Sequence, residues 1–333
     1  MTTAARSPVL VLERRAVAAL LDLEACIDAV ERAFRQRGTG RASAPGTLSF
    51  HAPRGTFHVK SGMLDLDRSV LVVKANANFP ANPNELGLPT IQGVIVLLDA
   101  HDGQPLAVLD SIEITRLRTA AATAVAAKRL ARPESEVATI CGCGEQGRVQ
   151  LQALRSVLSI HKVFAYDRDG CRSDRLADDL EQPGFEILPV ADLAGAVAES
   201  DVCVTCTTSR EFLLGRADVR PGTFIAAVGA DNPEKREIHP DLMSACTVVV
   251  DDLEQCAAIG DLHHAIAAGR MTREQVHADL AAVVAGTRPG RTREDEITLF
   301  DSTGVALEDA AAAALVYERA RDEDRCLSVR LGE

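Results

Sequence analysis

The first third of the chain carries short apolar or alternating runs of the length expected for β-strands. They lie at residues 9–12, 47–59, 69–74, 90–98 and 105–109. A turn over residues 99–103 joins the last two runs, which predicts a hairpin. Residues 25–34 have one apolar side at helical spacing, and residues 79–89 are rich in Pro, Asn and Gly, which predicts an irregular loop.

The remaining two thirds alternate short buried strands with helices. Apolar, β-branched runs predict strands at residues 137–141, 163–166, 186–190, 201–205, 223–228 and 247–250. Helical spacing of apolar residues predicts helices at residues 112–130, 146–158, 253–268, 273–285 and 302–321. This alternation predicts an α/β fold with a doubly wound parallel sheet. The last helix is Ala-rich, and we expect it to pack back onto the first domain, which would make that domain discontinuous.

A glycine-rich turn lies at the centre of this pattern. Gly142, Gly144 and Gly147 follow a predicted strand with G-x-G-x-x-G spacing. A helix comes next, and then a second strand that ends in Asp167. In this order the glycines permit a tight turn, close approach of a pyrophosphate, and close packing of helix on strand. The amides at the start of the helix attract the phosphates, so the pattern predicts a dinucleotide site.

The acid at the end of the second strand indicates which dinucleotide is bound. The Asp167 carboxylate suits the ribose hydroxyls and repels a 2′-phosphate, which favours NAD(H). Arg168 beside it would receive that phosphate, so NADP(H) stays open. We therefore predict a Rossmann NAD(P)-binding domain over residues 131–304. Residues 1–130 with 305–333 would form a smaller α+β domain for substrate binding and dimerisation.

Composition narrows the classes of partner. The formal net charge is −12 and the sequence pI is near 5.2, which argues against nucleic acid and an anionic membrane surface. There is no Trp and there are two Tyr, so we expect no platform for stacking bases. Neither a membrane-spanning run nor the pattern of a secretory signal is present, and we expect a cytoplasmic protein.

The cysteines and histidines do not predict a metal site. Cys203 and Cys206 have C-x-x-C spacing, but no second pair stands at zinc-finger distance. We expect the cysteines to be packing residues. His263 and His264 are adjacent on a predicted helix and point to different faces, and no H-E-x-x-H motif occurs. We therefore expect no bound metal.

Five stretches of the chain resemble one protein family. They are LPTIQGVIVLLD, PLAVLDSIEITRLRTAAATAVAAKRLARP, CGCGEQGRVQ, AVGADNPEKREIHPDL and FDSTGVALEDAAAA. The similarity runs from about Phe57 to Tyr317 and resembles the ornithine cyclodeaminase/μ-crystallin family. The resemblance implies a Rossmann domain and a second domain whose sheet forms a homodimer interface. It also implies NAD(P)(H)-dependent chemistry on small α-amino or α-imino acids.

The resemblance further implies roles for individual residues. Lys74 and Arg118 match the residues that bind the substrate carboxylate. Lys74 is also a candidate catalytic residue. Asp231 matches the acid that exchanges a proton with the substrate nitrogen. The implied cofactor-binding positions are Gly142, Gly144, Glu145, Gln146, Gly147, Asp167, Arg168, Thr205, Cys206, Thr207, Val228 and Gly229. General chemistry agrees, because the parallel donors of an arginine and the point charge of a lysine hold a carboxylate well.

One position departs from the family pattern. Judged by its spacing from Lys74, Lys60 lies near the place where ornithine cyclodeaminases have a glutamate. A glutamate suits the distal ammonium of a diamino acid, whereas a lysine repels that ammonium and suits a carboxylate. The alternative interpretation is an exposed strand lysine. As a substrate-binding residue, Lys60 favours an imino acid over ornithine.

Three functions are open at this stage. The favoured one is an NAD(P)H-dependent reductase of a small α-imino acid, that is, a ketimine or cyclic imine reductase or an amino-acid dehydrogenase. In this reading Asp231 transfers the proton, and Arg118 with Lys74 binds the carboxylate. The second is an ornithine cyclodeaminase, which uses NAD catalytically and releases ammonia. The third is a non-enzymatic, crystallin-type binder of NAD(P) and a ligand, which would need no proton acceptor at Asp231.

Overall fold

The computed structural model describes residues 8–43, 46–180, 182–321 and 326–331. The chain divides into unit 1, Met1–Arg118 with Val305–Glu333, and unit 2, Thr119–Gly304. The division falls inside helix α4 (Ile112–Leu130). The predicted fold class is confirmed, with a parallel Rossmann-like sheet and a second domain. The domain bounds derived from the sequence place all of α4 in the first domain and stay a prediction.

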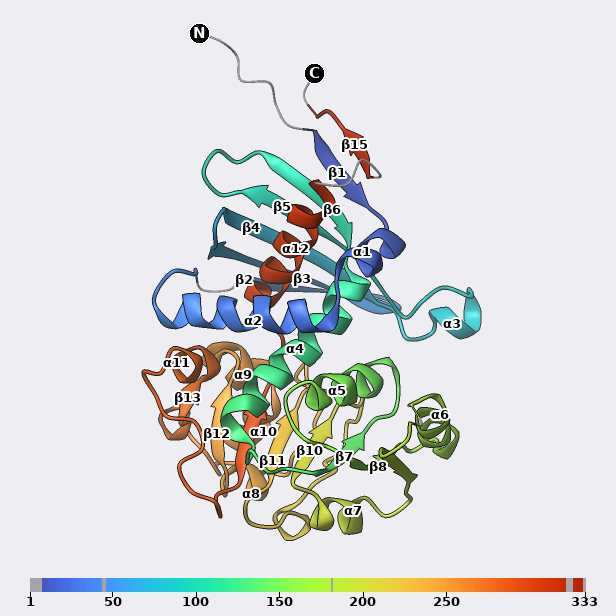
Figure 1. Cartoon of the computed structure of the whole chain (residues 1–333), viewed down its shortest axis with the longest axis vertical. Coiled ribbons are helices and arrows are strands. Elements are labelled where there is room, and N and C mark those ends of the chain that lie inside the picture. The colour runs from blue at the N-terminus through green and yellow to red at the C-terminus, as the bar shows by residue number, and fades with distance from the viewer. Residues whose placement is uncertain (1–7, 44–45, 181, 322–325, 332–333) are drawn as a thin grey trace. The chain divides into compact units, whose positions relative to one another are not determined.

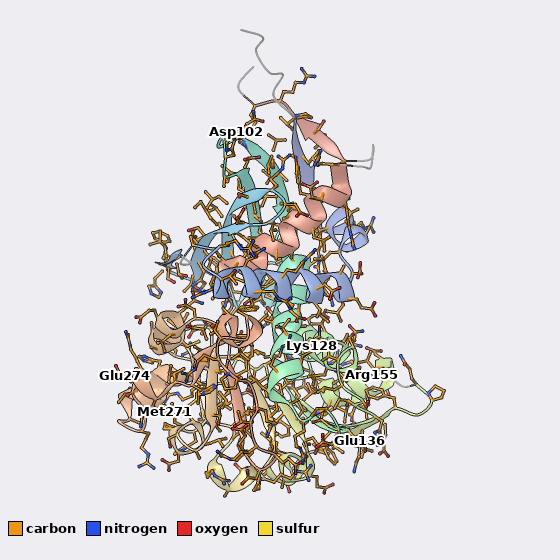
Figure 2. The ribbon with its side chains drawn as sticks, turned by 60° about the vertical axis from the view of Figure 1, so that its left-hand side comes forward. Asp102, Lys128, Glu136, Arg155, Met271 and Glu274 are labelled. Carbon is orange, nitrogen blue, oxygen red and sulfur yellow. The ribbon has the colours of Figure 1, made fainter. Side chains whose placement is uncertain are left out.

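Unit 1 is built on a seven-stranded sheet in the order β15-β1-β6-β5-β4-β3-β2. Its strands are β1 (Val9–Leu12), β2 (Gly46–Ala52), β3 (Gly55–Asp65), β4 (Ser69–Asn78), β5 (Ile91–Asp99), β6 (Pro105–Asp110) and β15 (Leu327–Val329). β1 and β6 run parallel, and the other neighbours run antiparallel. The predicted hairpin is β5–β6, and Asp102 lies in its turn (Figure 2).

Three helices of unit 1 lie on one face of this sheet, namely α1 (Arg14–Leu20), α2 (Leu23–Gly38) and α12 (Ala306–Arg321). The one-turn α3 (Asn82–Glu85) lies in the connection between β4 and β5. α12 packs on β3 and β4 and also against α2 (Figure 1). Small side chains permit this close approach, because a Cβ added at Gly62 of β3 would lie 3.3 Å from the Cβ of Ala306. The run of alanines in α12 is thus a packing surface for the sheet.

The two faces of the sheet differ in what covers them. Side chains alternate along each strand, so Lys60, Leu64, Val72, Lys74 and Ile95 share the helix-covered face and are buried. The opposite face carries large apolar side chains that are 43–61% exposed, namely Leu48, Phe50, Phe57, Met63 and Val94. These five residues define the open face of unit 1.

Unit 2 contains an eight-stranded sheet, all parallel, in the order β13-β12-β14-β11-β10-β7-β8-β9. Its strands are β7 (Val137–Cys141), β8 (Lys162–Tyr166), β9 (Glu186–Pro189), β10 (Val202–Thr205), β11 (Phe224–Ala227), β12 (Thr247–Val250), β13 (Ala278–Asp279) and β14 (Thr298–Asp301). The strand order reverses between β7 and β10. In doubly wound sheets, ligands bind at the carboxyl ends of the strands at such a point.

Helices and 3₁₀ turns connect these strands. They are α5 (Glu145–Arg155), α6 (Gly170–Leu180), α7 (Leu193–Glu199), η1 (Arg216–Asp218), α8 (Pro240–Met243), α9 (Leu253–Ile259), α10 (Asp261–Ala267), η2 (Arg273–Gln275) and α11 (Leu280–Val284). None of the helices in the described parts of the chain has both the length and the apolar composition that crossing a membrane requires.

The single helix predicted over residues 253–268 is wrong, because it breaks at Gly260 into α9 and α10. The carboxylate of Asp301 accepts hydrogen bonds from the amides of Asp261 and Leu262 at 3.3 and 2.9 Å. A Cβ at residue 260 would lie 2.7 Å from that carboxylate. A buried acid from a distant strand therefore starts a second helix here.

The helix predicted over residues 273–285 is also wrong. This segment forms η2, then the short strand β13, then α11. β13 pairs with β12, and the amide of His277 donates to the carbonyl of Val248. Strand pairing with the sheet edge thus overrides the local helical spacing. β14 was not predicted, and it lies inside the sheet between β12 and β11.

Candidate functional site

Three cations that the sequence indicated meet on the helix-covered face of unit 1. Lys60 of β3 and Lys74 of β4 stand directly opposite each other. Arg118 comes from α4, close in space to Lys74. The three residues are only 9%, 3% and 5% exposed. Lys60 is therefore not the exposed strand lysine of the alternative interpretation. Cations this deeply buried need anionic partners.

Those partners are Glu308 and Asp309, which the sequence analysis did not identify. The ammonium of Lys74 lies 2.8 and 2.7 Å from the two carboxylate oxygens of Asp309. The guanidinium of Arg118 lies 2.6 Å from Glu308 Oε2 and 3.2 Å from Asp309 Oδ1. Both acids are fully buried in the first turn of α12, where the helix dipole favours negative charge. The signal in the sequence that could have identified them is a pair of adjacent acids at the start of an Ala-rich helix.

The electrostatics of this cluster favour an added anion. Burial, together with the charges of Arg118 and Lys60, lowers the pKa of Lys74 to about 7, although Asp309 opposes the shift. Burial works against ionisation of Asp309, but the Lys74 and Arg118 cations hold its pKa below the ordinary value. Lys60, Lys74 and Arg118 thus place three cationic side chains together on this buried face. The cluster is thus suited to one more carboxylate.

In unit 2 the glycine turn has the shape that a pyrophosphate needs. Gly142 has φ of +102°, and a Cβ on it would lie 2.9 Å from the Cys206 carbonyl oxygen. A Cβ on Gly147 would collide with the Gly142 carbonyl. At Gly144, by contrast, no atom lies within 4 Å of the Cβ position, so the space in front of the turn is open. These are the three roles the motif assigns to its glycines.

The other cofactor-binding candidates gather at the same edge of the sheet. Glu145 and Gln146 open α5 directly after the turn. The loop after β10 is tied to β7, because the Cys206 amide donates to the Cys141 carbonyl at 2.9 Å. The loop after β11 is tied in turn to β10, because the Val228 amide donates to the Thr205 carbonyl at 2.9 Å. The structure therefore brings the glycine turn and both loops together.

Asp167 connects this turn to a cavity. Its Oδ2 accepts a hydrogen bond from the Cys143 amide at 2.9 Å, and its Oδ1 accepts one from the Asp169 amide at 3.0 Å. A cavity of about 360 Å³ lies beside it, lined also by Arg168, Ser173 and Val190. That volume is within the range of small-ligand pockets. The residues of this edge thus fit a dinucleotide, and the ribose contact of Asp167 stays a prediction.

Asp231, the proton-transfer candidate, lies in unit 2 just beyond the loop after β11. Its side chain is 52% exposed, and its Oδ1 lies 2.7 Å from the ammonium of Lys235. The Asn232 side-chain amide also donates to it, at 3.2 Å. The sequence analysis did not identify Lys235. The candidates therefore fall into two groups, with Lys60, Lys74 and Arg118 in unit 1 and the cofactor residues and Asp231 in unit 2.

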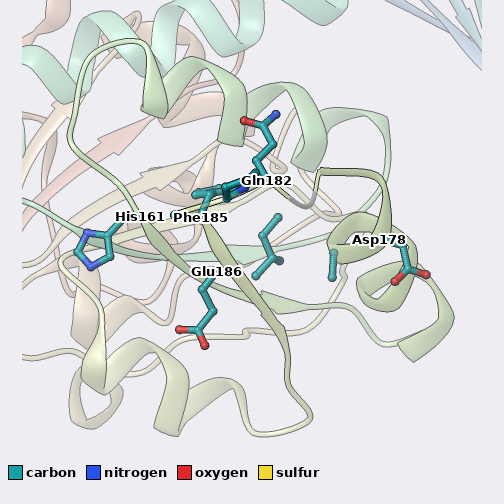
Figure 3. A pocket seen from close by; sticks show the side chains of 9 residues that line it. His161, Asp178, Gln182, Phe185 and Glu186 are labelled. Carbon is teal, nitrogen blue, oxygen red and sulfur yellow. The ribbon is translucent and has the colours of Figure 1, made fainter.

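A larger hollow of about 1050 Å³ lies where β9 begins, away from the glycine turn. His161 and Glu186 lie on one side of it and Asp178 on the other, so these groups do not converge (Figure 3). More generally, the parts of the chain that the structure describes hold no group of three His, Cys, Asp or Glu side chains arranged for a metal ion.

Known proteins resemble the chain over almost its whole length. The family model of the ornithine cyclodeaminase/mu-crystallin family matches residues 8–324. Alanine dehydrogenase of Archaeoglobus fulgidus is 37% identical over 311 residues, which cover 93% of this chain and 95% of that protein. Iminosuccinate reductase of Paracoccus denitrificans is 34% identical over 313 residues, which cover 94% and 97%.

Solved structures agree with these matches. An archaeal alanine dehydrogenase dimer with bound NAD superposes with a TM-score of 0.93 at 35% identity, covering 98% of this chain and 100% of that one. The Δ(1)-pyrroline-2-carboxylate reductase of Thermococcus litoralis, in complex with NADH and L-proline, gives 0.91 at 34% identity, covering 96% and 100%. The resemblance read from the five stretches is confirmed, and the chain belongs to the ornithine cyclodeaminase/μ-crystallin family.

Proposed function

We propose that this chain is an NAD(H)-dependent reductase that converts a small α-imino acid into the α-amino acid. The observation that carries the proposal is the buried cluster of Lys60, Lys74 and Arg118, in which Asp309 contacts Lys74 and Glu308 contacts Arg118. Such a cluster suits a ligand with one carboxylate. The open glycine turn of unit 2 supports the cofactor, and relatives named as alanine dehydrogenase and iminosuccinate reductase support the reaction class.

In this proposal Lys74 and Arg118 bind the substrate carboxylate. Arg118 offers a planar set of donors and Lys74 a point charge, the two kinds of contact that hold a carboxylate. Asp309 and Glu308 already hold both cations before substrate arrives. Because the side chains are ordered and desolvated in advance, the substrate has less ordering cost to overcome.

Reduction of an imine also needs a proton for the substrate nitrogen. Bound NAD(H) supplies the hydride chemistry at the carbon. Asp231 handles the proton, at the end of a loop that follows a strand of the cofactor edge. The ammonium of Lys235 at 2.7 Å orients the Asp231 carboxylate. Asp167 favours NAD(H), and the neighbouring Arg168 leaves NADP(H) as a second cofactor.

Lys60 separates this function from the second candidate, ornithine cyclodeaminase. Its ammonium is buried opposite Lys74. The distal ammonium of ornithine would meet a like charge there, at a cost that rises in a buried site. A carboxylate or a small apolar side chain meets no such repulsion. The family includes cyclodeaminases, and the experiment below therefore includes ornithine.

The active form in this proposal is a homodimer built on the open face of unit 1. Leu48, Phe50, Phe57, Met63 and Val94 expose large apolar side chains on one face of the sheet in the single chain. Soluble monomers rarely expose such patches, which mark interaction sites. An archaeal alanine dehydrogenase of the same fold is a dimer.

One experiment tests the proposal against both alternatives. Purified protein is incubated with NADH and cyclic imines, iminosuccinate, or pyruvate or glyoxylate with an amine, and separately with L-ornithine and NAD. NADH absorbance and released ammonia are followed together. Stoichiometric loss of NADH with an imino acid is expected. Ammonia and proline from ornithine without net change in NADH would instead establish a cyclodeaminase, and binding without any turnover would leave the crystallin-type role.

A further inference from the structure

A buried carboxylate joins the two loops at the proposed cofactor edge. Glu237 is fully buried. Its oxygens accept hydrogen bonds from the Thr207 amide at 2.7 Å, the Thr207 hydroxyl at 2.6 Å and the Gly229 amide at 2.9 Å. Thr207 belongs to the loop after β10, and Gly229 belongs to the loop after β11. One side chain therefore connects the ends of two neighbouring strands.

The surroundings of Glu237 are shaped for this carboxylate. A Cβ on Gly229 would lie 2.5 Å from the Glu237 Cδ, so only a glycine leaves room for it. From behind, Asp261 Oδ1 accepts hydrogen bonds from the amides of Glu237 and Ile238 at 2.8 and 2.9 Å. The backbone that carries the acid is thus anchored as well as its side chain.

Burying the Glu237 carboxylate costs free energy of folding, and a stabilising role alone does not explain why a buried acid lies here. Burial raises the pKa of Glu237, and the hydrogen bonds from Thr207 and Gly229 oppose the shift. Replacing a buried charge by apolar residues of similar size is often neutral or stabilising, so burial of this kind is weak evidence for a stabilising role. A fixed geometry of the two loops is the benefit that remains.

We propose that Glu237 is a positioning residue for the nicotinamide cofactor, holding the Thr207 and Gly229 loops at the spacing that the bound dinucleotide requires. This inference rests on the proposed function, because it takes these loops as part of the cofactor site. The effect extends to the glycine turn. The Cys206 carbonyl packs against Gly142, so a shift of the loop after β10 would also disturb the pyrophosphate site.

The test is NADH binding to the full chain carrying Glu237→Gln. The amide keeps the shape but places an NH₂ group against N–H and O–H donors, which removes at least one hydrogen bond to a charged group. We expect the Kd for NADH, measured by fluorescence titration, to rise by about tenfold or more. In steady state the KM for NADH should rise with it, while the KM for the imino acid stays within about twofold.

A control lies at the opposite edge of the same sheet, where the strands begin. Asp201 is a buried acid just before β10 that accepts hydrogen bonds from the amides of Glu136 and Val137 at 3.0 and 3.1 Å. Asp201→Asn should lower the Tm without changing the Kd for NADH. An equal rise in Kd for this variant and for Glu237→Gln would mean a general loss of stability and would overturn the inference.

A double-mutant cycle with Gly229 gives a second, independent measurement, and its single variant Gly229→Ala leaves Glu237 in place. Gly229→Ala places a methyl group against the Glu237 carboxylate and should weaken NADH binding. In a Glu237→Ala background the same methyl group has room, so Gly229→Ala should cause a smaller further rise in the Kd for NADH. Additive effects, or a Glu237→Gln protein that binds NADH as the wild type does, would overturn the inference. A wild-type protein that binds no NADH would instead refute the proposed function.

Discussion

Titration of Lys74 provides a test of the proposed carboxylate site. Burial, with help from Arg118 and Lys60, lowers its pKa from 10.5 to about 7. At pH 7 about half of the molecules then carry the Lys74 charge, and at pH 8 about one tenth do. Because the cation binds the substrate carboxylate in the proposed function, we expect kcat/KM for the imino acid to fall about tenfold per pH unit above pH 7.

Substitutions of two neighbouring residues should shift this fall in kcat/KM above pH 7 in opposite directions. Lys60→Met removes the like charge that stands opposite Lys74 on the next strand, so the pKa of Lys74 should rise. Asp309→Asn removes the anion that lies 2.7 Å from the ammonium, so the pKa should fall. Each shift should be on the order of one pH unit, the usual effect of a single nearby charge.

The assay is the initial rate of NADH loss at low imino acid concentration, from pH 5.5 to 9.5 at constant ionic strength. At each pH the rate of a variant is divided by that of the wild type, because the ratio cancels the titration of the substrate itself. Ratios that rise with pH for Lys60→Met and fall with pH for Asp309→Asn are expected. If kcat/KM begins to fall at the same pH in the wild type and in both variants, the assignment of Lys74 to the carboxylate site is refuted.

Three further predictions address the other parts of the proposal. Asp231→Asn keeps the shape but removes the group that transfers the proton to the substrate nitrogen, so turnover should fall at least about a hundredfold while the Kd for NADH changes little; unchanged turnover would remove Asp231 from the mechanism. Asp167→Ala should lower the ratio of kcat/KM with NADH to that with NADPH, and an unaltered ratio would contradict the ribose contact. Met63→Asp places a charge on the open face and should convert the dimer to a monomer in light scattering; Asp102→Lys, in the exposed β5–β6 turn, is the control that should leave the dimer intact.

Part of the proposed site could be read from the sequence because it depends on local rules. The glycine turn needs a positive φ at Gly142 and a close approach at Gly147, and these requirements appear as fixed spacings. Lys74 ends the predicted strand over residues 69–74, whereas Lys60 lies just beyond the run predicted over residues 47–59, and the strand register places the two lysines opposite each other. Arg118 and Asp231 came from the family resemblance, not from any periodicity.

The partners of these residues could not be read in the same way. Lys74 meets Asp309 across 235 positions of sequence, and Arg118 meets Glu308 across 190. No local pattern encodes such a pairing. No sequence pattern singled out Glu237, and only the fold buries it between Thr207 and Gly229.

The same division holds for the fold. Hydrophobic period and glycine spacing were sufficient to predict the Rossmann strands β7 to β12 and the strands β1 to β6 of unit 1, because these elements bury a regular pattern of their own residues. They did not predict β15, which pairs with β1. The break at Gly260 and the strand β13 depend instead on contacts with Asp301 and with β12. Local sequence thus determined which segments form elements and which carry chemistry. The tertiary structure decided where those elements end and which buried charges face each other, because burial strengthens long-range contacts that the isolated segments lack.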